Sequence, residues 1–185
     1  MRSLLFLLAV ALGTRTMAQP PGNGNGSALT FARSVNVALN GVQLHDKAMD
    51  AWTWTFGKQP GARVLSSDRA SGAIDGTARF NFRSTMLTMR EETMGVVQYK
   101  VTIRVNAGEC RILVSELTHT GNRNTTLGGV HVGPLIRGPW EGRKLRGMSR
   151  TNAQQLHEEL QTASEEQIRT LLNAFEARLR ANAGE

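Results

Sequence analysis

The chain has 185 residues, one cysteine and a formal net charge of +7, from 22 lysines and arginines against 15 aspartates and glutamates. A single cysteine excludes an internal disulfide, and this length suits one domain with a core large enough to need no cross-link. Cys110 lies on the apolar side of an alternating segment. This position favours a buried core residue over a reactive thiol.

Residues 1–18 are typical of a cleavable secretory signal peptide. Arg2 precedes an apolar run at 4–12, and Thr16 and Ala18 place small residues before the predicted cleavage site. The run is too short to span a bilayer, which takes about 20 residues. We therefore expect an exported protein, periplasmic or extracellular, with no transmembrane segment in the mature chain. Its net charge is +5, because Arg2 and Arg15 leave with the signal peptide.

The start of the mature chain is rich in proline, glycine and asparagine, so residues 19–32 are expected to be a flexible leader. An alternating strand is predicted at 34–39, followed by an Asn-Gly turn. Residues 43–57 place apolar side chains on one helical face. The aromatic residues that end this helix are expected to anchor it on a sheet; they are Trp52, Trp54 and Phe56.

The next segments carry the period of β-strands. Residues 62–83 predict a hairpin, and residues 84–93 a polar connection. The alternation of apolar and polar residues is cleanest at 96–105. It continues from Cys110 to about His119, again with apolar side chains predicted to face the core. One polar face along each strand indicates an antiparallel sheet that is covered on one side only. The sequence thus predicts an α+β domain at 33–120, with a helix packed on a curved antiparallel sheet in the order β-α-β-β-β-β.

Two further segments follow the domain. Residues 121–150 form a basic loop rich in glycine and proline, and a loop of this length is usually functional or disordered. Residues 151–182 are predicted to form C-terminal helices, because Thr151 and Ser164 each begin a capping-box pattern. Their apolar stripes are rotated relative to each other, which predicts two helices or one bent helix. Each stripe needs burial on the domain or on a partner.

These elements resemble a family of secreted bacterial proteins of unknown function with a TATA-binding-protein-like (TBP-like) fold. The resemblance runs from Val35 to His119, about half of the mature chain. Its carriers are the helix with Ala48, Trp52 and Phe56, the stretches 63–68 and 72–76, the alternation from Val97 to Val105, and the turn at 107–111. Cys110 stands where the family pattern has an aromatic residue. The resemblance implies a fold but no activity, cofactor or catalytic residue.

The sequence contains no recognisable nucleophile motif, phosphate loop, cofactor motif or metal-ligand set, so no catalytic, cofactor-binding or metal-binding residue is predicted. The leading hypothesis is a non-enzymatic exported binding or interaction module. Its candidate partner surface is the basic loop, with a tryptophan among cations: Arg137, Trp140, Arg143, Lys144 and Arg146. The partner is expected to be an anionic envelope surface or another protein, and export argues against nucleic acid.

Two alternatives remain open. A hydrolytic enzyme of the cell envelope would use His119 with His131, or the pair Asp46 and Asp50, which are one helical turn apart. A structural or assembly protein would act through its C-terminal helices.

Overall fold

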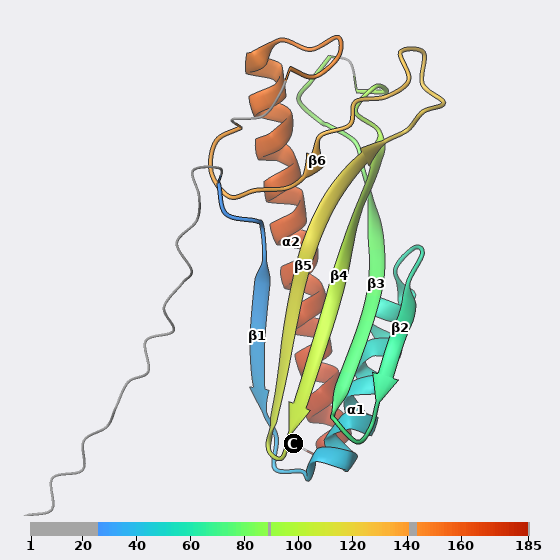
Figure 1. The fold of residues 1–185 in the computed structure, drawn as a ribbon, viewed down its shortest axis with the longest axis vertical. Helices are drawn as coiled ribbons and strands as arrows, with labels where there is room; N and C mark the ends of the chain where they lie inside the picture. The colour runs from blue at the N-terminus through green and yellow to red at the C-terminus, as the bar shows by residue number, and fades with distance from the viewer. Residues whose placement is uncertain (1–25, 89, 141–143, 185) are drawn as a thin grey trace, which may run out of the picture.

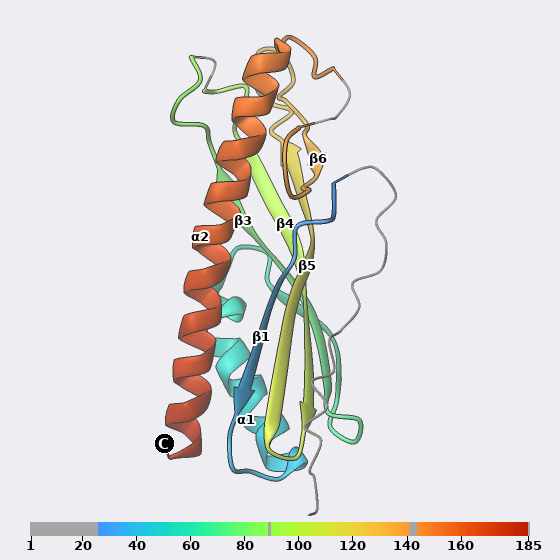
Figure 2. The ribbon, with the colours of Figure 1, turned by 90° about the vertical axis from the view of Figure 1, so that its left-hand side faces the viewer.

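The computed structural model describes residues 26–88, 90–140 and 144–184. The signal peptide predicted at 1–18 lies outside these residues. Six strands form one antiparallel sheet in the order β1-β5-β4-β3-β2, with β6 paired to β5. The strands are β1 (Phe31–Asn36), β2 (Arg63–Asp68), β3 (Ala73–Phe82), β4 (Gly95–Asn106), β5 (Glu109–Gly121) and β6 (Gly133–Pro134). Helices α1 (Gly41–Trp54) and α2 (Arg150–Ala183) lie on the same side of the sheet (Figures 1 and 2).

The predicted alternation places the core on one face of the sheet. Tyr99, Val101 and Ile103 of β4 are buried, and they face the helices together with Ile74 of β3 and Ile112 of β5. The intervening residues of the three long strands are half-buried or exposed. The α+β fold, with a helix on one face of a curved antiparallel sheet, is therefore confirmed. Cys110 is also buried in this core, as predicted.

Helix α1 begins where the Asn40 side chain accepts a hydrogen bond from the backbone N–H of Gln43, at 2.9 Å. Trp52 and Phe56 anchor its end as expected, since their rings stack with centroids 5.5 Å apart. The prediction that Trp54 also anchors the helix on the sheet was wrong, because its side chain is 52% exposed. It points away from the sheet, and the cationic groups of Lys58 and Arg178 lie over its ring.

Helix α2 is one continuous helix of 34 residues rather than two helices or a bent one. No glycine or proline interrupts residues 150–183. The capping residue is Ser149, whose hydroxyl accepts from the N–H of Asn152, while Ser164 is buried inside the helix. Both apolar stripes are covered by the domain itself: the later one packs on α1 and β1, and the earlier one faces the loop after β5. No helix among the described residues is long and apolar enough to cross a bilayer.

The segment between β5 and α2 belongs to the core. Strand β6 pairs with Thr118 and His119, and five apolar side chains of the segment are buried: Val130, Val132, Leu135, Leu145 and Met148. The end of the predicted leader joins it, because Leu29 is buried and its N–H donates to the carbonyl of Leu135. Glu92 holds the start of the segment by accepting hydrogen bonds from the Thr125 hydroxyl and from the N–H groups of Leu127 and Gly129.

Gly76 of β3 marks the closest approach of the sheet to α1. A Cβ atom there would lie 2.4 Å from the nearest ring carbon of Trp52, which is itself buried. We predict that Gly76→Ala lowers the free energy of unfolding by about 1–3 kcal/mol, because the indole has to move within a packed core.

Urea unfolding of the variant measures this loss. Gly41→Ala is the matched control, because its Cβ would meet no atom closer than 3.8 Å. Equal stability of the Gly76→Ala and Gly41→Ala proteins would contradict the packing described here.

Candidate functional site

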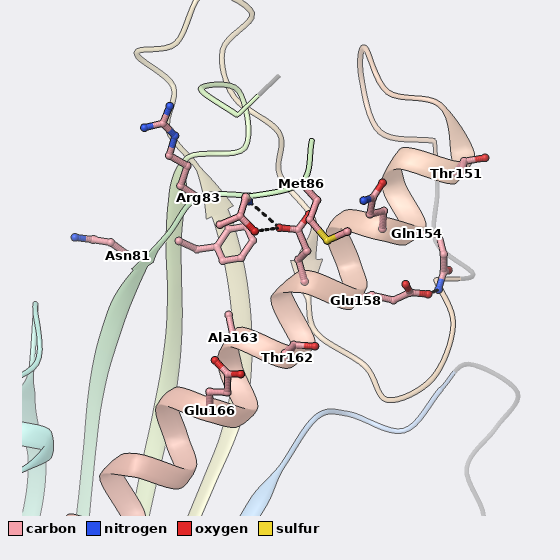
Figure 3. A pocket seen from close by; sticks show the side chains of 13 residues that line it. Asn81, Arg83, Met86, Thr151, Gln154, Glu158, Thr162, Ala163 and Glu166 are labelled. Carbon is pink, nitrogen blue, oxygen red and sulfur yellow. Dashed lines mark hydrogen bonds between the residues drawn. The ribbon is translucent and has the colours of Figure 1, made fainter. Parts of the chain in front are cut away.

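A groove lies between the first half of α2 and the chain that leaves β3 (Figure 3). Its volume is about 860 Å³, the size of a site for a small molecule or a short peptide segment. The lining residues are Asn81, Phe82, Arg83, Thr85, Met86, Thr151, Gln154, Gln155, Glu158, Glu159, Thr162, Ala163 and Glu166. We refer to this concavity as the α2 groove.

The surface of the α2 groove is more apolar than polar. Met86 is 67% exposed and is the most exposed large apolar side chain among the described residues. In Figure 3 its sulfur lies next to the first turns of α2, and the methyl group of Ala163 points into the same space. A thioether on a flexible side chain adapts to partners of different shape, so this wall suits a hydrophobic contact.

Carboxylates of α2 form the other wall. Glu158, Thr162 and Glu166 follow one another at intervals of four residues, so they lie on one side of the helix. Glu158 accepts a hydrogen bond from the Gln154 amide, and Glu166 has no partner among the described residues. Both glutamates are exposed. The groove therefore combines an apolar wall with a negative rim, in a protein whose overall charge is positive.

Glu159 has a structural role at the same place. Its carboxylate accepts from the Ser84 hydroxyl at 2.7 Å and from the N–H of Thr85 at 2.9 Å. These bonds fasten the chain after β3 to α2. Sequence reasoning missed the groove, because its two walls are at least 65 residues apart in the sequence and Met86 lies in a segment predicted only as a polar connection.

The structure uses part of the predicted partner surface for packing. Arg137 donates to the carbonyl of Thr30 and lies over the ring of Phe31. Trp140 is half-buried, and its ring lies 5.3 Å from that of His157 in α2. Lys144 and Arg146 are exposed, whereas Arg143 lies outside the described residues. Arg137 and Trp140 therefore also help to hold the loop in place, and the partner surface stays a prediction.

His119 and His131 come together, as their positions beside the loop suggested. His119 is fully buried, its Nδ1 faces the N–H of Val132, and burial, with a smaller effect of neighbouring His131, lowers its pKa to about 4. His131 accepts a hydrogen bond from the N–H of Gly121. Neither histidine lines the α2 groove.

The two aspartates lie on the opposite end of the molecule as members of ion pairs. Asp46 bonds to Arg69, and Asp50 bonds to Arg178 at 2.9 Å. The hydrogen bonds from these arginines hold the pKa of each carboxyl below its usual value. Burial raises the pKa of the Cys110 thiol to about 12. Within the part of the chain that the structure describes, no three histidine, cysteine or acidic side chains are grouped to hold a metal ion.

Comparison with solved structures places the fold. A TBP-like protein from Parabacteroides distasonis aligns over 85% of this chain and 96% of its own, with a TM-score of 0.53 and 11% sequence identity. A DUF4468 family protein from Bacteroides ovatus aligns over 80% of this chain and 86% of its own, with a TM-score of 0.47 and 16% identity. The TBP-like resemblance is thus confirmed for the fold. No protein-family model matches the sequence, and no curated protein matches it either.

The buried histidines predict acid sensitivity. A histidine whose pKa is lowered on folding stabilises the protein above the unfolded pKa of 6.5, and this stabilisation is lost as the pH falls from 6.5 toward 4. Burial also lowers the pKa of His157. We predict that the change from pH 7 to pH 5 costs the wild type about 2 kcal/mol more in free energy of unfolding than it costs His119→Gln.

Chemical denaturation at the two pH values measures this difference. The carboxylates with lowered pKa titrate below this window, so they do not mask it. An identical loss of stability in the wild type and the variant would show that His119 is not buried in its neutral form.

Proposed function

We propose that this protein is an exported, non-enzymatic binding module, whose α2 groove takes a segment of another protein. The segment would carry an apolar side chain flanked by lysine or arginine. Export rests on the signal-peptide pattern at 1–18, and the binding role rests on the groove.

The observation that carries the proposal is the placement of exposed Met86 and the exposed carboxylates of Glu158 and Glu166 around one concavity. A concave surface that is mainly apolar and rimmed by charged groups is typical of a binding groove. Glu158 and Glu166 are two turns apart, so their carboxylates are separated by about 12 Å along the helix axis. Two cations on an extended segment reach both carboxylates while an apolar side chain between them contacts Met86.

The lining favours binding over hydrolysis. The described residues of the groove include no histidine, cysteine, serine or lysine, so it lacks the usual nucleophile and base pair. The carboxylate of Glu159 is already bonded to Ser84 and Thr85. The structure also argues against assembly through the apolar stripe of α2, because the domain's own sheet and α1 already cover this stripe.

A random peptide library displayed against the mature protein, residues 19–185, tests the proposal. We predict enrichment of peptides with an apolar residue beside lysine or arginine. Reversal of charge in Glu158→Lys or Glu166→Lys should weaken binding of a selected peptide by about tenfold each, measured by calorimetry. Met86→Ser should also weaken it, because the apolar contact is lost.

Glu165→Lys provides the matched control, since Glu165 is exposed on the same helix, pairs with Arg169 and does not line the groove. Its affinity for the selected peptide should stay within about twofold of wild type, apart from a uniform effect of net charge. Enrichment of acidic peptides, or equal losses in all three glutamate variants, would refute the proposal.

A further inference from the structure

We propose a second site: the open face of the sheet binds a linear acidic polysaccharide. This site adjoins the α2 groove, because Asn81, Phe82 and Arg83 line both. The helices cover only the other face, so the outward side chains of β2, β3, β4 and β5 remain uncovered among the described residues (Figures 1 and 2). Two depressions lie side by side on this face. Each is lined by two arginines, and neither is lined by a carboxylate.

The first depression lies over β2 and β3 and has a volume of about 470 Å³. Arg63 and Arg79 line it, together with Thr77 and Gln98. Both arginines are held along the surface: Arg63 Nε donates to the Thr77 hydroxyl at 3.4 Å, and the Arg79 side chain lies against the backbone of Gly61. Their guanidinium groups are therefore partly oriented before a ligand arrives.

The second depression lies over the ends of β3, β4 and β5 and has a volume of about 670 Å³. Arg83 and Arg123 line it, with polar side chains that include Asn81, Thr120 and Asn122. The strand register joins the two depressions, because Arg79 pairs with Gln98 and the next outward pair is Asn81 with Val96. A row of amide and hydroxyl side chains thus connects two pairs of arginines.

Some cationic side chains on this face form ion pairs with carboxylates, and others do not. Arg104 and Arg111 pair with Asp75 and Glu109, and Lys100 lies 3.9 Å from Glu116. The four arginines of the two depressions have no ion-pair partner among the described residues. Unpaired guanidinium groups bind carboxylates in bidentate fashion, so an anionic ligand complements this part of the face.

The arrangement favours a polymer chain over a membrane or a single anion. Arg79 lies on β3 and Arg83 directly follows the end of this strand, four positions further along the chain, so the two cationic ends are separated by about 13 Å. One small anion cannot reach both ends. A flat bilayer does not enter recessed depressions, whereas a sugar chain offers hydroxyl groups to the amides between the arginines and carboxylates to the arginines themselves.

Oligogalacturonates of defined length provide the probe, and calorimetry on the mature protein at low salt provides the readout. Affinity should rise with chain length until both depressions are filled, and the methyl-esterified oligomer, which keeps the sugars but loses the charges, should bind at least about tenfold more weakly. Arg63→Glu with Arg79→Glu should lower the affinity by at least about tenfold, and the corresponding lysine variants should lower it less.

Arg90→Glu with Arg150→Glu is the charge-matched control, because both residues are exposed and line neither depression. This control changes the net charge by the same amount and should retain most of the affinity. Equal loss in the control variant, equal binding of the esterified oligomer, or tighter binding to phosphatidylglycerol vesicles or single-stranded DNA than to any oligogalacturonate would overturn the proposal. Thermal unfolding of the variants, all at exposed positions, should match that of wild type.

Discussion

The burial of one apolar stripe of α2 against one face of the sheet is the contact on which the rest of the structure depends. Phe175 of α2 contacts Phe56, whose ring in turn meets Tyr99 at the centre of β4. Aromatic rings bury large apolar areas, and centroid distances near 6 Å are those of favourable ring contacts. This chain of rings joins α2, the end of α1 and the middle strand into a single core.

Both proposed sites follow from this one-sided arrangement. Because α2 is longer than the part of the sheet that α1 covers, its first turns extend beyond α1 and meet the chain after β3, where the α2 groove opens. Because both helices occupy the same face, the opposite face keeps its polar and cationic side chains in water. The two sites differ in sign: the groove carries a negative rim, and the sheet face carries unpaired arginines. They are therefore suited to different partners.

The strands and helices were largely predictable from local periodicity. Alternation of Tyr99, Val101 and Ile103 was sufficient to define the inward face of β4, because side-chain period in a strand is independent of distant contacts. The loop after β5 was harder, since its glycines and arginines obscured the apolar residues Val130, Val132 and Leu135. Their burial depends on pairing with β5 and on contact with α2.

The candidate sites were beyond the reach of local patterns. Thr85, next to Met86, bonds to Glu159 of α2 across 74 positions, and Arg137 bonds to Thr30 across 107 positions. No period in the sequence reveals which exposed cation is used for packing and which is free. The sequence alone does not distinguish Arg137 from Arg79. Their contacts in the folded protein show that Arg137 anchors a loop and that Arg79 has no ion-pair partner among the described residues.

Native-state hydrogen exchange on residues 19–185 tests the central claim most directly. If α2 completes the core, the amides of residues 168–179 should exchange with the same free energy of opening as those of residues 97–103 in β4, independent of protein concentration. Exchange of the α2 amides at a much lower free energy, or protection that appears only at high protein concentration, would show that the helix covers a partner rather than its own sheet.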